Sequence, residues 1–260
     1  MDDQQRLRVL VTGAGSGLGA ALADAWQRRG ARVLATDRDP SGLAGREYAD
    51  TLDITDAADW VRIRERVAQE WGGLDVLVNN AGVPGGGRID VAEVDEWRWI
   101  FEINLFGMVT GLRELVPLFK SQRSGQIVNV ASLAGLVHPA GMGSYNAVKS
   151  AVVALTETLG HELAGFGVEA SVVCPSYFRT NLMDRMQGAD TGLAEVMRGL
   201  VTGAPLGADD IAEAVLDGLE RGEQLIVPDP AARDAVRLKR EDRAGYDAVM
   251  RRQAAKLGGL

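Results

Sequence analysis

Short runs of apolar residues alternate along the chain with longer stretches in which apolar and polar positions mix. The short runs predict strands at residues 8–12, 32–36, 74–79, 126–132, 168–174 and 224–227, with a weaker strand at 48–53. Several of these runs are almost continuously apolar and rich in valine. This pattern is typical of strands that are covered by helices on both faces.

The longer stretches have the length and periodicity of helices. They are residues 18–29, 57–71, 94–120, 144–166 and 209–221. We expect Asp56 and Asp209 to cap two of these helices, because an aspartate side chain accepts a hydrogen bond from a free backbone N–H of the first turn. Gly30, Gly72 and Gly167 stand at predicted helix ends, where a residue in the left-handed region is common.

The alternation of strands and helices predicts an α/β fold. We expect a Rossmann-like, doubly wound parallel sheet of about seven strands. No linker rich in proline or serine and no internal repeat interrupts the chain, so residues 1–260 are predicted to form a single domain. Two segments depart from the alternation. Residues 176–207 are expected to form a substrate lid, and the charged residues 228–260 a helical tail packed on the outside.

Composition narrows the classes of function. The chain has 260 residues and a formal net charge of -8, which disfavours binding to nucleic acid. No uncharged apolar run of about 18 residues predicts a membrane span, and the polar first residues lack the features of a secretory signal. One cysteine and two histidines are too few for a cysteine–histidine zinc site, so no metal is expected. A cytoplasmic protein is the default expectation.

A glycine-rich turn joins the first predicted strand to the first predicted helix. It spans residues 12–19 and reads TGAGSGLG. Glycines permit a positive φ and let the backbone approach a pyrophosphate closely. The helix N-terminus adds free N–H groups and a partial positive charge. We therefore interpret this turn as a phosphate-binding segment for a dinucleotide, with contacts from Gly13, Ser16, Gly17, Leu18 and Gly19.

An acid at the end of the second strand bears on the choice of dinucleotide. Asp37 can accept hydrogen bonds from both hydroxyls of the adenosine ribose, and it would repel a 2′-phosphate. NAD is therefore the preferred cofactor. The neighbouring Arg38 could instead hold a 2′-phosphate, so NADP stays possible. A plain turn role is the alternative interpretation of Asp37, because the residues that follow it are turn-rich.

Tyr145 and Lys149 are four residues apart, so they share one face of a predicted helix that Ser144 could cap. A phenol normally titrates near pH ~10. A neighbouring ammonium, together with a nicotinamide cation, favours the phenolate and lowers that pKa. Ser132 ends the preceding strand, where its hydroxyl can hold a substrate oxygen in line with the phenol. These three residues are candidates for a proton-transfer site.

Taken in order, these motifs resemble those of the short-chain dehydrogenase/reductase family. The resemblance covers roughly residues 7–227. Asn79, Asn80, Ala81 and Gly82, at the end of the fourth strand, are similar to the family's NNAG motif. Asp53 and Ile54 match the acid and the apolar residue that contact the adenine in the family.

Two further matches complete the resemblance. Asn104 matches the family's structural and catalytic asparagine. The segment from Pro175 through Tyr177 to Thr180 is similar to the PGxxxT segment that holds the nicotinamide carboxamide. Ser176 replaces the usual glycine of that segment, and a residue other than glycine restricts the backbone there.

The resemblance implies a mechanism. Tyr145 is implied to be the acid–base catalyst, and Lys149 to lower its pKa and to bind the nicotinamide ribose. Ser132 is implied to orient the reacting oxygen. Asn104 is implied to link Lys149 to solvent through a helix kink and a water. Hydride passes directly between the nicotinamide and the substrate carbon.

The surroundings of the expected substrate are mostly apolar. We expect substrate contacts from Ser132, Leu133, His138, Met142, Tyr145, Tyr177 and Met183. An NAD(P)-dependent oxidoreductase for a hydrophobic or cyclic ketone or secondary alcohol is the leading interpretation. One alternative is a reductase of 3-oxoacyl thioesters on an acyl carrier, using NADPH. Another is a regulator that binds NAD(P) without turnover.

The family resemblance also implies self-association. The helices that follow the fourth and fifth strands commonly pack against their symmetry mates in the family, and here they are residues 94–120 and 144–166. The second has more apolar surface than a solvent-facing helix needs, from Ala147, Ala151, Val152, Leu155 and Leu159. We therefore expect a homotetramer or homodimer that acts on a small-molecule substrate.

Overall fold

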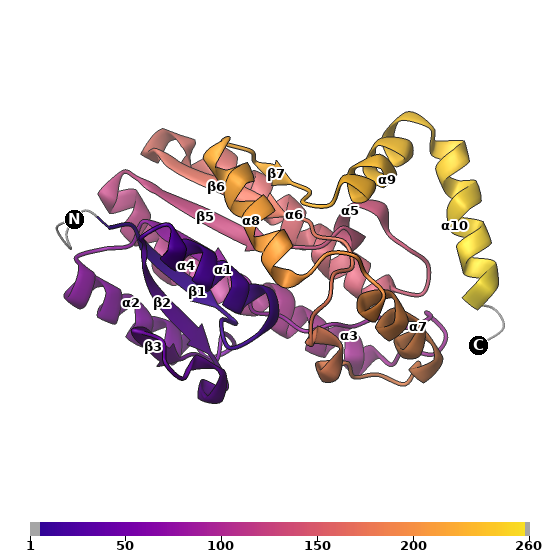
Figure 1. The fold of residues 1–260 in the computed structure, drawn as a ribbon, viewed down its shortest axis with the longest axis horizontal. Helices are drawn as coiled ribbons and strands as arrows, with labels where there is room; N and C mark the ends of the chain where they lie inside the picture. Colours follow the sequence, from indigo (N-terminus) through magenta and orange to yellow (C-terminus); the bar gives the residue numbers. More distant parts are fainter. Residues whose placement is uncertain (1–5, 258–260) are drawn as a thin grey trace.

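A computed structural model of the chain describes residues 6–257. Seven parallel strands form one sheet in the order β3-β2-β1-β4-β5-β6-β7 (Figure 1). The strands are β1 (Arg8–Thr12), β2 (Arg32–Asp37), β3 (Tyr48–Thr51), β4 (Val76–Asn79), β5 (Gly125–Val130), β6 (Val168–Val173) and β7 (Leu225–Ile226). The prediction of a single-domain, Rossmann-like α/β fold with a seven-stranded parallel sheet is confirmed.

The helices fall largely where the sequence predicts them. The α-helices are α1 (Gly17–Arg28), α2 (Ala57–Trp71), α3 (Val94–Phe101), α4 (Gly107–Gln122), α5 (Ala134–Val137), α6 (Gly143–Leu163), α7 (Thr191–Thr202), α8 (Ala208–Glu220), α9 (Pro230–Glu241) and α10 (Arg243–Leu257). Shorter helical segments of other types are η2 (Pro40–Leu43), η3 (Glu102–Phe106), η4 (Ala164–Phe166) and η5 (Leu182–Arg185). Gly72 and Gly167 end their segments in the left-handed region, as expected, each with a φ of 68°.

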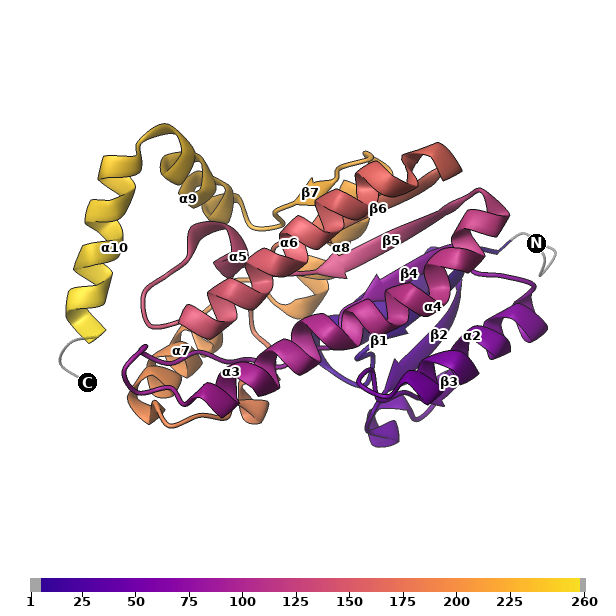
Figure 2. The same cartoon turned by 180° about the vertical axis from the view of Figure 1, so that it is seen from behind.

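Helices cover both faces of the sheet. Helices α1 and α8 pack on the face seen in Figure 1, and α2, α4 and α6 pack on the face seen in Figure 2. Successive side chains of a strand point to opposite faces. Val9 and Val11 therefore lie in the core beneath α1 and α8, whereas Leu10 lies in the other core. All three side chains are fully buried, which explains why the strands read as continuous apolar runs.

The strand order reverses at the centre of the sheet. Strand β1 pairs with β2 on one side and with β4 on the other. In open parallel sheets, ligands bind outside the carboxyl ends of the strands at this point, because the connections leave in opposite directions and open a crevice. The loops that follow β1 and β4 are therefore positioned to form a site.

Helix starts differ in part from the prediction. Asp56 caps α2 as expected, with its carboxylate accepting a backbone N–H of the first turn at 2.8 Å. The prediction for Asp209 is wrong: Gly207 is the N-cap of α8, and Asp209 lies within the first turn. Ser144 does not cap α6 either, because the helix begins one residue earlier and Met142 is the N-cap. A short polar side chain signals a helix start only to within a residue or two.

The predicted helix at residues 94–120 is interrupted. The π-helical segment η3 separates α3 from α4. A π turn shifts the backbone hydrogen-bonding register by one residue, and such turns often occur at functional sites. Asn104 lies within this segment and is buried.

The two segments outside the alternation are helical. Residues 176–207 contain η5 and α7, and residues 228–260 contain α9 and α10. Helix α9 packs against α5, while α10 stands away from the sheet beside α9 (Figures 1 and 2). Within the described residues, both segments therefore contain helices.

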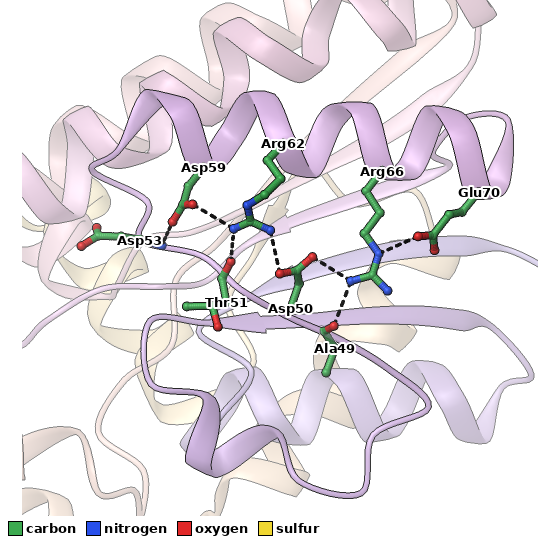
Figure 3. Close-up of polar contacts among 8 residues, drawn as sticks. All are labelled: Ala49, Asp50, Thr51, Asp53, Asp59, Arg62, Arg66 and Glu70. Carbon is green, nitrogen blue, oxygen red and sulfur yellow. Dashed lines mark hydrogen bonds and ion pairs between the residues drawn. The ribbon is translucent and has the colours of Figure 1, made fainter.

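Edge strand β3 is tied to α2 by a network of ion pairs (Figure 3). Arg62 and Arg66 both contact the carboxylate of Asp50, at 2.6 and 2.7 Å. Asp59 accepts a hydrogen bond from the backbone N–H of Asp53 at 2.8 Å. These contacts fix the backbone that leaves β3, and they place Asp53 at the edge of the site described below.

Within residues 6–257, every helix is too short or too polar to span a bilayer. The same part of the chain holds no group of three or more histidine, cysteine, aspartate or glutamate side chains arranged to bind a metal ion.

Candidate active site

A cavity of about 1080 Å³ lies at the carboxyl ends of the central strands. It exceeds the range of roughly 300–1,000 Å³ that is usual for small-molecule sites, so it has room for two ligands. The predicted site residues that line it are Gly13, Ser16, Gly17, Leu18, Asp37, Arg38, Asp53, Ile54, Asn80, Ala81, Gly82, Asn104, Ser132, Leu133, Met142, Tyr145, Lys149, Pro175, Tyr177, Thr180 and Met183. Gly19 and His138 do not line it.

The glycine-rich turn forms one end of the cavity. Gly17 has a φ of 56°, and a Cβ there would lie 2.8 Å from the hydroxyl of Thr180. Gly19 has a different role from the predicted cofactor contact, because a Cβ on it would lie 2.0 Å from the carbonyl oxygen of Gly13. Gly19 lets α1 pack closely against the turn. The hydroxyl of Ser16, the N-cap residue, makes no capping bond to the helix.

Asp37 is held in place at the end of β2. Its carboxylate accepts hydrogen bonds from the backbone N–H groups of Gly15 at 3.0 Å and Asp39 at 3.1 Å. The residue is only 5% exposed and lines the cavity. Arg38 lines the same part of the cavity but is exposed to solvent. The carboxylate is therefore the more firmly positioned of the two charged groups.

A threonine that the sequence analysis left unassigned joins two of the motifs. The buried hydroxyl of Thr12 accepts hydrogen bonds from the backbone N–H groups of Asn80 and Ala81, each at 3.0 Å. The side-chain amide of Asn80 donates back to the carbonyl of Thr12 at 3.0 Å. These bonds hold the ends of β1 and β4 together. The sequence indicates this joining role only through the position of Thr12 at the start of the glycine-rich turn.

Asn104 anchors the loop that follows β4. Its side-chain oxygen accepts from the backbone N–H of Val83 at 3.1 Å. Its amide donates to the carbonyl oxygens of Val83 and Ile100, each at 3.1 Å. The side chain thereby fixes Gly82 and Val83 against the π-helical segment. No contact with Lys149 is formed directly, so the expected proton relay would need the water that the mechanism includes.

Tyr145, Lys149 and Ser132 come together at the inner end of the cavity. The hydroxyl of Ser132 lies beside the Tyr145 phenol and acts to lower the phenol's pKa. The oxygen of Ser132 accepts the backbone N–H of Ala134 at 3.2 Å. Lys149 is only 5% exposed, and its ammonium donates to the carbonyl of Val130 at 3.1 Å. It lies 5.7 Å from the centre of the Tyr145 ring. The three predicted residues therefore share one site.

The ionisation of this pair differs from the expectation. Burial raises the pKa of Tyr145 to about 12, and the hydrogen bond with Ser132 offsets only part of that effect. Burial also lowers the pKa of Lys149 to about 8. We expected Lys149 to lower the pKa of Tyr145, but desolvation of the phenolate outweighs any such effect among the protein's own groups. Near neutral pH, Tyr145 is therefore a protonated phenol.

Apolar side chains surround the other end of the cavity. Met142, Met183, Leu193, Met197 and Val201 form a buried cluster, with Tyr145, Tyr177, Met186 and Leu257 packed against it. The hydroxyl of Tyr177 donates to the sulfur of Met142 at 3.5 Å. The methionines of the segment 176–207 thus pack over the position where a substrate would meet Tyr145.

His138 points away from the cavity, unlike the prediction. Its Nε2 lies 3.2 Å from the carbonyl of Gly135 and 3.0 Å from the hydroxyl of Ser150, and its Nδ1 lies 2.8 Å from the ammonium of Lys239. The backbone of His138 is left-handed, with a φ of 53°. That turn directs the ring toward α9 rather than toward Tyr145, and proximity in sequence could not reveal it.

Ser176 does not strain the segment after β6. Within residues 6–257, Arg123 and His138 are the non-glycine residues with positive φ, so Ser176 adopts an ordinary backbone conformation. Replacement of the family's glycine is therefore compatible with the loop geometry. Thr180, at the end of the segment, reaches the glycine-rich turn at Gly17.

Three cavity residues come from the C-terminal tail. They are Ala235 of α9 and Met250 and Gln253 of α10. The charge pattern of this segment predicted outside packing and gave no indication of these cavity contacts. A weak signal exists in the sequence, because Tyr246, Met250, Gln253 and Leu257 follow helical spacing and share one face of α10.

The glycine-rich turn, the acid after β2 and the tyrosine–lysine pair define a dinucleotide-dependent oxidoreductase, and comparisons with known proteins agree. Residues 8–190 match the short chain dehydrogenase family. The chain is 31% identical over 219 residues to 3-oxoacyl-[acyl-carrier-protein] reductase of Thermotoga maritima, a match covering 80% of this chain and 87% of that relative.

Two solved structures share the fold. A short chain dehydrogenase/reductase from Burkholderia phymatum in complex with NAD has a TM-score of 0.85 and 30% identity, with 93% of this chain and 95% of that chain covered. A short chain dehydrogenase from Burkholderia cenocepacia in complex with NADP has a TM-score of 0.81 and 27% identity, with 95% and 98% covered. The chain belongs to the short-chain dehydrogenase/reductase family. It is an NAD(P)-dependent oxidoreductase that acts on CH–OH or C=O groups.

Proposed function

We propose that the protein interconverts an apolar or cyclic secondary alcohol and the corresponding ketone, with NAD as the preferred cofactor. One observation carries this proposal. The phenol of Tyr145 shares the cavity with Ser132 and lies between the glycine-rich end and the apolar cluster around Met142 and Met183. A carbonyl group bound against the phenol would therefore have apolar surroundings on the side away from the cofactor.

The residues present fit a nicotinamide dinucleotide. At Gly17 a side chain would collide with Thr180, so glycine lets the segment after β6 approach the start of α1. In the proposal, a pyrophosphate binds at this helix start. The helix N-terminus supplies N–H groups to that anion. Asp37, oriented by two backbone N–H groups, is placed to accept the ribose hydroxyls. A 2′-phosphate would meet this buried carboxylate, which supports NAD over NADP.

The protein's own groups handle the proton. The cofactor supplies hydride to the carbonyl carbon and accepts it in the reverse direction. During reduction, the Ser132 hydroxyl and Tyr145 phenol donate hydrogen bonds to the carbonyl oxygen, and Tyr145 then gives its proton to the forming alkoxide. Because the oxygen of Ser132 already accepts from Ala134, its hydrogen is directed elsewhere. During oxidation, the Tyr145 phenolate takes the proton of the alcohol.

Lys149 and Asn104 support this chemistry in the proposal. The ammonium of Lys149, beside the Tyr145 ring, favours the phenolate that oxidation requires. In the proposal, Lys149 also binds the nicotinamide ribose. Asn104 keeps the loop around Gly82 in place, and it would return protons from Lys149 to solvent through a water.

A reductase of 3-oxoacyl thioesters on an acyl carrier is the second candidate. It is supported by the relative from Thermotoga maritima, which bears that name and is 31% identical. Preference for NADPH and for carrier-bound substrates would distinguish it. A regulator without turnover is a weaker candidate, because Asn104, Ser132, Tyr145 and Lys149 are all present in the site.

The test is a panel of ketones, secondary alcohols and 3-oxoacyl thioesters, assayed in both directions with NAD(H) and NADP(H). Absorbance of the reduced nicotinamide is followed. We expect turnover of apolar ketones and alcohols, with the higher kcat/KM for NAD(H). Turnover of carrier-bound 3-oxoacyl substrates with NADPH alone would establish the second candidate. Tight cofactor binding without turnover of any member would support the regulator.

A further inference from the structure

Helices α9 and α10 form a C-terminal arm, residues 230–257, that extends past the region matched by the family. Figures 1 and 2 show α10 standing off from the sheet at the end of the molecule where α5 and α7 lie. Among the described residues of α10, Tyr246 alone is fully buried. The helix is therefore not part of the core, and its position depends on a few contacts.

The inner face of the arm borders the cavity of the active site. Met250 and Gln253 of α10 line that cavity, as does Ala235 of α9. Leu257, one turn further along α10, packs against the apolar cluster over Tyr145. The carbonyl of Leu257 accepts a hydrogen bond from Arg88 at 3.5 Å. The arm thus closes the side of the cavity that lies away from the glycine-rich turn.

Lys239 connects the arm to the C-terminal end of α5, between Ser132 and Tyr145 in sequence. Its ammonium donates to the carbonyl of Leu136 and to Nδ1 of His138, the latter at 2.8 Å. The same ammonium lies 5.9 Å from the centre of the Tyr246 ring, at the start of α10. The Lys239 side chain therefore contacts both the end of α5 and the start of α10. These contacts suit it to hold the arm in place.

Gln253 is the polar member of the cavity-lining set on the arm. A side-chain amide both donates and accepts hydrogen bonds. Met250, on the same face, and the methionines of the apolar cluster offer only dispersion contacts. A substrate that reaches the arm would thus meet an apolar wall with one hydrogen-bonding group in it.

We propose that Met250 and Gln253 form the outer wall of the substrate site and recognise a polar, hydrogen-bonding substituent remote from the reacting carbon. Lys239 acts as the positioning residue that holds this wall. The substrate class is then an apolar ketone or secondary alcohol with a hydroxyl or carbonyl group at its far end. This inference rests on the proposed function and narrows it.

The first test uses linear methyl ketones in matched pairs, ending in either a hydroxyl or a methyl group, over a series of chain lengths. In the wild type, we expect kcat/KM to favour the hydroxyl member once the chain is long enough to reach α10. Gln253→Leu should lower the hydroxyl-to-methyl ratio by about three- to tenfold, the value of one hydrogen bond. No hydroxyl preference at any length, or an unchanged ratio in the variant, overturns the proposal.

The second test compares Lys239→Met with Arg240→Met, which removes the same charge from the exposed face of α9. Hydrogen–deuterium exchange of α10 should become faster in Lys239→Met alone. The hydroxyl-to-methyl ratio should fall with it, and the loss should appear in KM rather than in kcat, because the arm stands away from Tyr145. Equal exchange and equal selectivity in both variants would show that Lys239 does not position the wall.

A binding measurement separates this proposal from the proposed function. The dissociation constants of the same ketone pairs are measured with enzyme that holds oxidised NAD, which cannot reduce them. One outcome is that the wild type binds the hydroxyl ketones more tightly than the methyl ketones, that Gln253→Leu abolishes this difference, and that the enzyme with NADH turns over none of them. This outcome would contradict the proposed function and support the role of Gln253 in the outer wall. Turnover of apolar ketones with equal binding of both members of each pair would support the proposed function and contradict the proposed outer wall.

Discussion

At the residue scale, Tyr145 and Lys149 are ionisable side chains that the fold buries side by side. Burial disfavours the charged form of each, so it raises the pKa of Tyr145 to about 12 and lowers that of Lys149 to about 8. The protonated phenol is the form that reduction consumes. The protein's own environment therefore prepares Tyr145 as an acid, and a positive charge on the nicotinamide would favour its use as a base during oxidation.

Tyr145→Phe tests the proton-transfer role. The substitution keeps the ring and its packing but removes the group that exchanges a proton with the substrate. Turnover of the best ketone should fall by ~10²–10⁴, the usual size of general acid–base catalysis. The thermal unfolding midpoint and the dissociation constant for NAD serve as controls and should stay at wild-type values. Near wild-type turnover in this variant would refute the assignment of Tyr145.

Lys149→Met tests the cost of the buried ammonium. Because the folded pKa is about 8 and the ordinary value is 10.5, the folded chain binds fewer protons between these pH values, and stability rises with pH across that window. Loss of the bond to Val130 offsets part of the gain. We expect the variant to be more stable at pH ~7 by about 2 kcal/mol.

Denaturant unfolding of wild type and Lys149→Met at several pH values provides the measurement. The advantage of the variant should shrink as the pH rises from about 8 to 10.5, because over that range the wild-type lysine is neutral in the folded state but still protonated in the unfolded chain. Cofactor affinity and turnover should both decrease. A variant less stable than wild type at every pH would contradict this account.

Asp37→Ala tests the cofactor preference. The substitution removes the acceptor for the ribose hydroxyls and the charge that repels a 2′-phosphate. The ratio of the NADP to the NAD dissociation constant should fall by at least about tenfold, the value of one charged hydrogen bond. The unfolding midpoint must be checked as well, since Asp37 also accepts from Gly15 and Asp39. Wild-type protein that binds NADP as tightly as NAD would show that Arg38 outweighs Asp37.

Sequence motifs located most of the cavity residues because these residues lie at strand ends, where spacing and topology determine position. Ser132 and Tyr145 are examples, and both line the cavity. His138 lies between them in sequence, yet its left-handed backbone directs the ring toward Lys239. Gly19 belongs to the motif, yet it contacts the backbone of Gly13 rather than the cavity. Side-chain direction depends on backbone angles that motif spacing does not contain.

At the element scale, hydrophobic periodicity predicted where helices lie but not where a helix is interrupted. It gave residues 94–120 as one helix, but the structure has α3, η3 and α4. A π turn adds one residue to a helical turn and leaves no change in composition. Its stabilisation comes from Asn104, whose partner Val83 lies in a loop distant in sequence. A contact of this kind cannot be read from the helix's own residues.

The same limit applies to the C-terminal arm. The charged sequence of α9 and α10 predicts exposed helices, and most of α10 is exposed. That one face of α10 borders the cavity cannot be read from its own residues, because the arm is attached through contacts such as that of Lys239 with Leu136 and His138. That contact joins residues about a hundred positions apart.

We expect the attachment of the arm to depend on pH through His138. The Lys239 ammonium can only donate, so Nδ1 of His138 accepts and the ring hydrogen lies on Nε2, toward Gly135 and Ser150. Burial, Lys239 and Arg243 lower the pKa of His138 below its ordinary 6.5. The folded chain therefore binds fewer protons than the unfolded chain as the pH falls below 6.5, and stability decreases.

The hydrogen–deuterium exchange rate of the backbone amides in α9 and α10, corrected for the intrinsic effect of pH on exchange, should therefore rise as the pH falls below 6.5. A proton on Nδ1 would face the ammonium of Lys239. His138→Asn provides the control, because asparagine tolerates the left-handed backbone and does not titrate. Its arm should exchange at a rate independent of pH. The same acid dependence in wild type and variant would assign the effect to another group.

At the scale of the whole molecule, the sequence predicted the class of the sheet and the topology supplied the site. Alternating elements indicate parallel strands. The reversal of strand order at β1 brings residues as distant as Asp37 and Tyr145 to the same cavity. The sequence also suggested an apolar stripe on α6 for self-association. Val152 and Leu159 of that stripe are buried in the protein's own core, so they provide no surface for a partner.

Self-association is still expected, on a smaller set of residues. Helices α4 and α6 lie on the same face of the molecule (Figure 2). Phe106, at the start of α4, is 52% exposed although it is large and apolar, and Ala147 is exposed on α6. We expect sedimentation velocity at micromolar concentration to show a dimer or tetramer. Phe106→Asp should shift it toward monomer, because a charge at a closed apolar contact is costly.

Leu7→Asp is the matched control for this prediction. Leu7 is 50% exposed and precedes β1, at the opposite end of the strands from the active site. The substitution introduces the same charge at a residue of similar exposure, so it should leave the sedimentation coefficient unchanged. Wild-type protein that sediments as a monomer would refute self-association altogether. Equal dissociation in both variants would show that net charge, rather than the face formed by α4 and α6, controls assembly.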